Sequence, residues 1–278
     1  MGRFKQNKSP TLQIVPLYIT FKNMNEKPKL YIASCSFGKD SIATILLALE
    51  HNEPLDRVVF AEVMFDHERG ISGEIPEHIE WIYNVAIPKL AEMGVKVDVV
   101  RAKKDYVSLC RQVLKSGKNQ GKCYGVQNSR PCYANSDLKI APIRQYLNRL
   151  KKEYDVVQYV GIAIDEPKRL ERLRGTNKVS LLKKYGYTEQ EARKKCEDYG
   201  LLSPIYGGGC RGGCFFCFFS EIDRYINIRN NYPHYWQALK DLYYETKSQS
   251  FKYRKTLEQV EREMDLKERG KKHQLKLF

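Results

Sequence analysis

Short apolar runs alternate with longer segments of helical periodicity over the first two thirds of this 278-residue chain. Runs rich in β-branched and aromatic residues predict buried strands at 30–33, 57–65, 95–100 and 156–163. Between and before them, apolar positions recur at helical spacing and predict helices at 42–49, 76–93, 106–114 and 136–152, the second bent by Pro88. Strands and helices that alternate in this way predict a Rossmann-like α/β fold, with a parallel sheet, right-handed crossovers and helices on both faces.

The pattern changes after about residue 175, where helices predominate. Helices are predicted at 188–199, 221–230, 234–248 and 253–269, and Thr188 with Glu191 predicts a capping box at the first of them. A segment rich in glycine and cysteine, 207–217, interrupts the series. We therefore expect four parts: a basic arm at 1–28, an α/β domain at 29–175, a small Cys-rich metal-binding segment at 176–232 and a basic helical tail at 233–278. Within the arm, 11–20 has the character of an edge strand because it contains Pro16.

The turn between the first strand and the first helix reads Ser-Phe-Gly-Lys-Asp-Ser at 36–41. The N–H groups of a helix's first turn lack internal acceptors and the helix dipole favours negative charge there, so this turn predicts an anion site. Gly38 allows close approach of the backbone, Lys39 adds a positive charge, and Ser36 and Ser41 offer hydroxyl donors. The spacing differs from the Walker pattern. The alternative is an ordinary turn with Asp40 and Ser41 as caps.

The composition narrows the class of protein. The formal net charge is +15, and residues 1–29 and 251–278 carry much of the excess, which favours a polyanionic partner such as tRNA or DNA. The alternative is that these ends are only solvated, and a nucleotide substrate also explains part of the charge. We find no apolar run of about 18 residues and no signal-like N-terminus, so we expect a cytoplasmic protein without a membrane partner.

The eight cysteines are too sparse for a disulfide scaffold and point instead to metal binding or catalysis. Cys210, Cys214 and Cys217 follow one another at short spacing in a glycine-rich segment, which lets the backbone wrap a metal closely. Cys196 or Cys132 is the candidate for a fourth ligand. Zinc and an iron–sulfur cluster both remain open, as does the alternative that these thiols bind no metal.

Three elements of the chain together resemble a known family. The loop at 36–41 resembles the pyrophosphate loop of the adenine nucleotide alpha-hydrolase (PP-loop ATP pyrophosphatase) superfamily, in the form typical of the phosphoadenylylsulfate (PAPS) reductase-like branch. The segments 132–142, Cys-Tyr-Ala-Asn-Ser-Asp-Leu-Lys-Ile-Ala-Pro, and 161–169, Gly-Ile-Ala-Ile-Asp-Glu-Pro-Lys-Arg, are similar to two further elements of that branch. The resemblance covers roughly residues 30–240 and implies that the domain at 29–175 holds an adenine nucleotide across the strand ends.

The resemblance also implies site residues. Lys39, Asp40 and Asp165 are the candidate catalytic residues, and Asp165 with Glu166 can hold Mg²⁺ or a ribose hydroxyl. Arg169 has the alternative of an exposed helix face, and Asp66 that of a turn former. The candidate nucleotide-binding residues are Ser36, Phe37, Gly38, Lys39, Asp40, Ser41, Asp66, Lys139, Gly161, Glu166 and Arg169. The family's cluster-bearing reductases have a Cys-Cys pair where this chain has Cys132-Tyr133, and the implied metal group is a [4Fe-4S] cluster or Zn²⁺.

Three functions are consistent with the sequence. The first is cleavage of ATP to AMP and pyrophosphate with Mg²⁺, which activates a substrate such as tRNA or DNA for sulfur transfer from a sulfur donor protein. The second is a sulfonucleotide reductase, although the nucleophilic cysteine of that class lies in a C-terminal motif and no cysteine follows Cys217 here. The third is a nucleotide-binding regulatory or defence subunit with little turnover. An oligomer is compatible with each.

Overall fold

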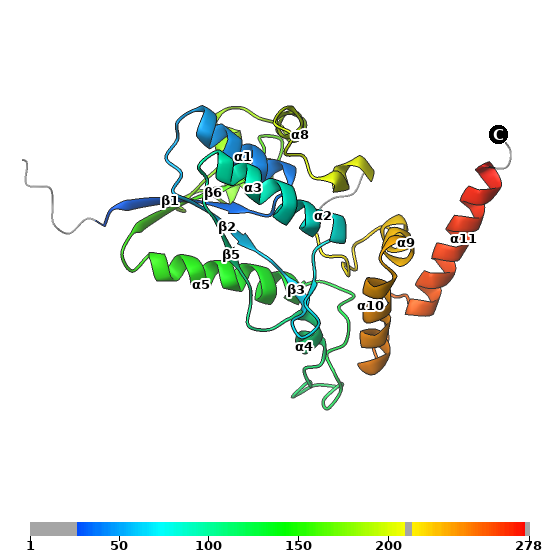
Figure 1. The fold of residues 1–278 in the computed structure, drawn as a ribbon. Helices are drawn as coiled ribbons and strands as arrows, with labels where there is room; N and C mark the ends of the chain where they lie inside the picture. Colours follow the sequence, from blue (N-terminus) through cyan, green and yellow to red (C-terminus); the bar gives the residue numbers. More distant parts are fainter. Residues whose placement is uncertain (1–26, 209–212, 276–278) are drawn as a thin grey trace, which may run out of the picture.

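The computed structural model describes residues 27–208 and 213–275 and is built on a five-stranded sheet, most of whose strands are labelled in Figure 1. Each pairing in this sheet is parallel, in the order β5-β2-β1-β6-β7. The predicted α/β architecture is confirmed. The predicted edge strand at 11–20 and Cys210 lie outside the described residues. The strands of the sheet are β1 (Lys29–Cys35), β2 (Arg57–Ala61), β5 (Val97–Val100), β6 (Asp155–Val160) and β7 (Lys178–Val179).

The apolar run at 57–65 does not form one strand, as predicted, but two. The chain leaves the main sheet after Ala61, and β3 (Met64–Asp66) pairs antiparallel with β4 (Ile71–Ser72). A hydrogen bond from the N–H of Gly73 to the carbonyl of Val63, at 2.7 Å, joins the two ends of this β3–β4 hairpin. The pattern of apolar residues does not show where the chain stops pairing with one strand and begins to pair with another, because β2 and β3 are both buried.

Helices cover both faces of the sheet, as Figure 1 shows. Ile32 and Val59 face α5 and pack with Leu147 from it, whereas the neighbouring positions Ala33 and Phe60 join the core on the other face. This alternation is the two-residue period of a strand buried on both sides. The helices on the two faces are α1 (Lys39–Glu50), α2 (Pro76–Trp81), α3 (Ile87–Glu92), α7 (Leu181–Lys184) and α8 (Glu189–Asp198) on one, and α5 (Ala141–Leu150) on the other.

Two of the predicted helices contain a wider π-helical turn. One, η1 (Ile82–Ala86), separates α2 from α3 shortly before Pro88, and the other, η2 (Ala134–Ile140), precedes α5 and Pro142. Proline cannot donate a hydrogen bond to the carbonyl four residues earlier, and its ring clashes with that carbonyl. A wider π-helical turn before the proline avoids the clash. The helix predicted at 106–114 ends early, as α4 (Tyr106–Cys110), because Val113 pairs with Cys123 instead.

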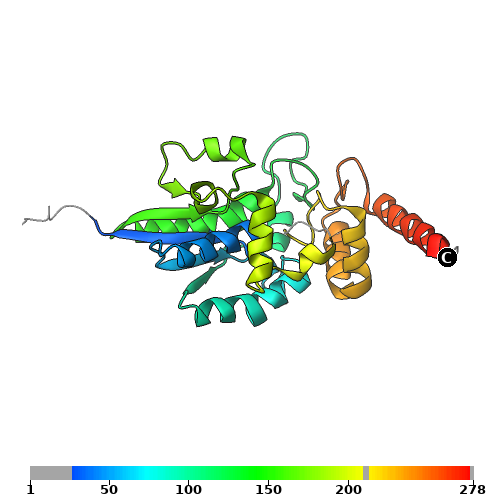
Figure 2. The ribbon, with the colours of Figure 1, turned by 90° about the horizontal axis from the view of Figure 1, so that it is seen from above.

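The C-terminal helices lie beyond the carboxyl ends of the strands (Figure 2). They surround a second core in which Phe65 of β3, Phe215 and Trp236 are buried. The predicted capping box at Thr188 is present. No helix within the described residues is both long and apolar enough to cross a membrane. The remaining helices are α6 (Pro167–Glu171), η3 (Pro204–Gly208), α9 (Ile222–Asn231), α10 (Pro233–Glu245) and α11 (Leu257–Leu275).

Candidate active site

The carboxyl ends of β1 and β6 lie side by side at the point where the chain connections diverge. Ser34 is opposite Val160 in the register. The chain leaves β1 into α1 on one face and reaches β6 from α5 on the other, which makes this edge a topological switch point, the usual ligand site of open α/β sheets. A cavity of about 480 Å³ opens there. Its lining includes the predicted residues Ser36, Gly38, Asp40, Ser41, Lys139, Gly161 and Arg169.

The loop at 36–41 is anchored from behind by an aromatic side chain. Phe37 is fully buried and meets the ring of Phe60 edge-on, with centroids 5.1 Å apart. Its φ of 56° lies in the left-handed region, which a bulky residue rarely adopts. The hydroxyl of Ser41 donates to the carbonyl of Gly38 at 2.9 Å and accepts from the N–H of Ser36 at 3.3 Å. Phe37 and Ser41 therefore shape the loop from inside.

Two backbone donors of this loop are left for a ligand. The N–H groups of Gly38 and Asp40 have no acceptor among the described residues, whereas that of Lys39 donates to the hydroxyl of Tyr206 at 3.0 Å. Both lie at the N-terminus of the twelve-residue α1, where the dipole adds positive potential. This arrangement suits a phosphate or pyrophosphate group.

Gly161 brings the end of β6 against the loop. A Cβ atom at this position would lie 2.6 Å from the carbonyl carbon of Asp40 and 2.7 Å from the backbone nitrogen of Ser41. Both contacts are with backbone, so any side chain here would push the loop away. Glycine is therefore required at position 161, which was predicted to bind the nucleotide, because two backbones pack closely there beside the cavity.

Three cations line the cavity: Lys139, Arg169 and Lys178. Lys139 forms no ion pair with a described residue, whereas Arg169 pairs with Glu166 at 2.5 Å. Burial raises the pKa of Cys35 to about 11, and the charge of Lys139 acts against this rise. Lys139 and Lys178, neither of which forms an ion pair with a described residue, are therefore the cations most available to an anionic ligand.

Lys39 does not line this cavity. Its ammonium group donates to Asp40 at 2.7 Å and to Glu189 of α8 at 2.9 Å. Burial lowers the pKa of Lys39, but the two carboxylates outweigh burial and the pKa lies above its ordinary value. Burial raises the pKa of Asp40 despite the contact with Lys39. Lys39 thus ties the loop to α8, while Asp40 faces the cavity.

Other predicted residues are held elsewhere. Asp165 accepts from the N–H of Glu189 at 3.2 Å and so caps α8. Asp66 accepts from both the backbone and the side chain of Arg69, at 3.0 and 2.7 Å, which makes it a turn former. Glu166 lies outside the lining, but its carboxylate pairs with the lining residue Arg169, and its charge helps to raise the pKa of Asp40. The structure does not bring Asp165 or Asp66 to the cavity.

Glu74 is a lining residue that no sequence pattern singled out. It is 3% exposed, and its Oε1 is buried without a hydrogen-bond partner among the described residues. Its backbone forms an antiparallel bridge with Cys214. A buried carboxylate oxygen without a partner is costly unless a ligand or cation satisfies it, so Glu74 is a candidate ligand-binding residue. Its only signal in the sequence is the tight Ser-Gly-Glu-Ile-Pro turn at 72–76.

The structure separates the candidate metal ligands into two groups. Cys132 and Cys214 pack against the second core, and the N–H of Cys217 donates to the carbonyl of Cys214 at 3.1 Å. Burial raises the pKa of Cys214, and Glu74, Cys217 and Cys132 add to this rise. Cys196 instead packs in the core between α1 and α8, where its thiol donates to the carbonyl of Lys39 at 3.1 Å. No three His, Cys, Asp or Glu side chains of residues 27–208 and 213–275 converge tightly enough to hold a metal ion.

Comparison with known proteins adds little beyond this geometry. No family model matches the chain, and no curated protein matches it either. Among the solved structures that match is the U34-tRNA thiolase NcsA from Methanococcus maripaludis with its [4Fe-4S] cluster. The alignment covers 80% of this chain and 71% of that chain, with 15% sequence identity and a TM-score of 0.38. At this score the superposition is too loose for any function to be inferred from it.

Proposed function

We propose that this chain is an enzyme of the PP-loop type, which binds ATP between β1 and β6 and cleaves it to AMP and pyrophosphate. One observation carries the proposal. The backbone N–H groups of Gly38 and Asp40 and the ammonium group of Lys139, none of which has a partner within the described part of the chain, line one cavity at the switch point of the sheet. The cavity volume of about 480 Å³ is within the range of small-molecule sites.

The residues present divide the work of the reaction. The loop N–H groups and Lys139 bind the pyrophosphate portion and stabilise the charge that develops on it as it leaves. An oxygen of the substrate attacks the α-phosphorus, a new P–O bond forms, and the bond between the α-phosphorus and the bridging oxygen breaks. The carboxylates of Asp40 and Glu74 are oxygen ligands of the kind that Mg²⁺ binds, and Mg²⁺ would neutralise phosphate charge there.

The adenylylated substrate would then react with sulfur. We assign tRNA or DNA as the acceptor, a sulfur donor protein as the source, and AMP as the group that the sulfur nucleophile displaces. Cys132, Cys214 and Cys217, together with Cys210, are thiols of the kind that an iron–sulfur cluster or zinc would require. The three described thiols do not converge tightly enough to hold a metal ion, so binding would require them to draw together. A cluster held by only three of these four cysteines would leave one iron site open to bind sulfur.

Product analysis with labelled ATP and Mg²⁺ tests the reaction. The protein is expected to release AMP and pyrophosphate, and Lys139→Ala to lower the rate by about a hundredfold, the effect of removing one charge-stabilising donor. Lys152→Ala is the matched control, because this exposed lysine follows α5 at the opposite end of the sheet. ADP and phosphate as products, or a Lys139→Ala protein of full activity, would refute the proposal. Sulfite from a sulfonucleotide would indicate the reductase, and binding without turnover a regulatory subunit.

A further inference from the structure

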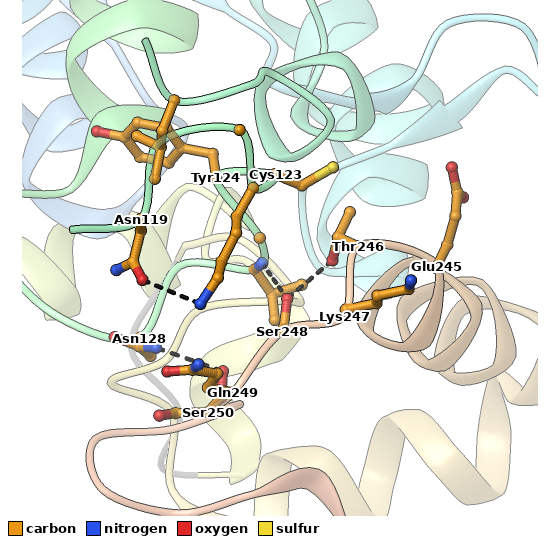
Figure 3. Close-up of a pocket in the computed structure, with 15 residues that line it drawn as sticks. Asn119, Cys123, Tyr124, Asn128, Glu245, Thr246, Lys247, Ser248, Gln249 and Ser250 are labelled. Atoms are coloured by element: carbon orange, nitrogen blue, oxygen red, sulfur yellow. Dashed lines mark hydrogen bonds between the residues drawn. The ribbon is translucent and has the colours of Figure 1, made fainter. Parts of the chain in front are cut away.

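A second concavity, of about 640 Å³, lies between the loop at 114–128 and the loop at 245–250. Asn119, Tyr124 and Asn128 reach it from the first loop, and Ser248 and Gln249 from the second (Figure 3). Its walls are mainly amide, hydroxyl and basic groups. The one acid among them, Glu245, is paired with Arg111 at 2.6 Å.

Hydrogen bonds join the two loops into one surface. The hydroxyl of Ser248 accepts from the N–H of Val126 at 2.8 Å, and the amide of Asn128 donates to the carbonyl of Ser250 at 3.3 Å. Gly125, with a φ of +75°, lets them approach, since a Cβ there would lie 2.6 Å from the hydroxyl oxygen of Ser248. The approach is thus specified by particular residues of both loops.

Positive charge is concentrated on these loops. Residues 111–133 contain five lysines and arginines and no acid, and residues 246–255 contain four and no acid. Arg111 and Lys255 pair with carboxylates. Lys252 donates to the carbonyl of Ser220. The others form no ion pair with a described residue, so their charge is available to a polyanion: Lys115, Lys118, Lys122, Arg130, Lys247 and Arg254.

Exposed aromatic rings accompany this charge. Tyr124, Tyr133 and Phe219 are 42%, 40% and 53% exposed, although such rings are usually more deeply buried. Tyr124 and Tyr133 meet edge-on with centroids 5.1 Å apart, and the guanidinium of Arg130 lies 4.9 Å from the centroid of the Phe219 ring. Exposed rings beside unpaired cations are the combination that stacks unpaired bases and follows their phosphates.

The rings are also close in sequence to the thiols of the proposed metal site. Cys132 lies between Arg130 and Tyr133, and Phe219 comes two residues after Cys217. Cys132 and Cys214 pack against the same core, and Cys214 forms a backbone bridge with Glu74, which lines the nucleotide cavity. A base stacked on these rings would therefore be held beside residues that neighbour the thiols in the chain.

We infer that this basic aromatic surface, formed by 114–133, Phe219 and 246–255, binds single-stranded nucleic acid, with bases stacked on Tyr124, Tyr133 and Phe219. The inference rests on the proposed function, for which it identifies unpaired nucleotides as the form of the acceptor. The tyrosines and Phe219 supply stacking, and the cations supply contacts to phosphate that do not depend on sequence.

Fluorescence anisotropy without ATP tests this surface, using a labelled 20-nucleotide single-stranded RNA, the DNA of the same sequence and the RNA duplex. We expect tighter binding of the single strands than of the duplex, and a preference between RNA and DNA shows which acceptor the surface favours. Phe219→Ala and Tyr124→Ala should each weaken binding by about tenfold. Phe219→Trp should retain it. Tyr199→Ala, which removes an exposed ring from the end of α8, is the matched control.

The charge contribution has its own readout. Arg130→Ala should lower the slope of log affinity against log salt by about one, whereas Arg193→Ala on α8 should leave it unchanged. Equal affinity for duplex and single strand, or unchanged binding by the Phe219→Ala and Tyr124→Ala variants with wild-type circular dichroism spectra, would overturn the inference. Because ATP is absent, this result is independent of whether the protein cleaves ATP.

Discussion

The cavity at the sheet edge and the concavity between the loops at 114–128 and 245–250 are both basic but are built in opposite ways. At the sheet edge, a six-residue turn aims backbone N–H groups at one point, and Lys139 and Arg169 line the same cavity. Between the loops at 114–128 and 245–250, cations are spread along the chain and polar side chains form the walls. Converging donors suit a compact anion such as pyrophosphate, whereas spread cations with exposed rings suit an extended polyanion. The form of a basic site is thus informative in addition to its charge.

The difference between the two concavities is tested most directly by displacing the loop at 36–41, whose backbone N–H groups point to one place. Gly161→Ala would place a methyl group 2.6 Å from the backbone of Asp40, and the loop must shift. We expect ATP affinity to fall by at least tenfold and stability by about 1–3 kcal/mol, the usual cost of overpacking. Calorimetric titration with ATP and urea denaturation measure the two effects.

Gly270→Ala is the control for the added methyl group, since its Cβ would meet nothing within 4 Å in α11. It should leave ATP affinity unchanged. Single-stranded RNA should bind the Gly161→Ala protein normally, because the second concavity does not include this residue. Wild-type ATP affinity in Gly161→Ala would show that the loop and the end of β6 do not form one site.

The thiols extend the comparison to the second core, against which Cys132 and Cys214 pack. Cys214→Ser should reduce the bound iron or zinc by most of its wild-type amount, measured on anaerobically purified protein. Cys196→Ala should retain the metal and lose only about 1–2 kcal/mol of stability, since this thiol is buried beneath α1 and away from Cys214. A visible absorbance band distinguishes a cluster from zinc. Loss of metal in Cys196→Ala alone would contradict this assignment.

A smaller effect is expected from His78, which supports the loop from below. Its Nε2–H donates to the carbonyl of Ser36 at 3.2 Å, and its Nδ1 lies 2.8 Å from the hydroxyl of Ser203. Burial lowers the pKa of His78, Lys139 lowers it further, and Glu74 acts in the opposite direction. The folded protein therefore binds a proton here less readily than the unfolded chain does.

The sign of the pH dependence follows from this difference. The contribution of neutral His78 is complete above the unfolded pKa of 6.5 and is lost as pH falls below it. Urea denaturation at pH 8 and pH 5.5 should show a larger loss at low pH in the wild type than in His78→Gln. Equal losses in both proteins would mean that His78 does not titrate as the buried geometry requires.

Those parts of the fold and site that consist of consecutive residues could be predicted from the sequence. Those that depend on contacts between residues far apart in the chain could not. The sheet and the loop at 36–41 follow from local periodicity and one motif, because strand, turn and helix are consecutive. Lys39 and Asp165 were expected at the ligand but bind Glu189 and the N-terminus of α8, which lie about 150 and 24 residues away. No local pattern shows such partners.

The basic surface escaped prediction for a related reason. Totals over the chain ends, 1–29 and 251–278, drew attention to the termini, whereas 111–133 carries five cations and no acid within the middle. Only the folded structure shows that 246–255 lies against this segment. Glu74 could not be predicted for the same reason, because only the folded structure shows its buried carboxylate oxygen without a partner among the described residues and its backbone bridge to Cys214.

Photolabelling with 8-azido-ATP, followed by peptide mapping, tests most directly which concavity holds the nucleotide. We predict labelled peptides from the ends of β1 and β6 or from the segment that contains Lys139, with labelling that excess ATP prevents and that Lys139→Ala diminishes. Label confined to 114–128 and 245–250, or label that ATP does not displace, would contradict the assignment of the nucleotide to the sheet edge.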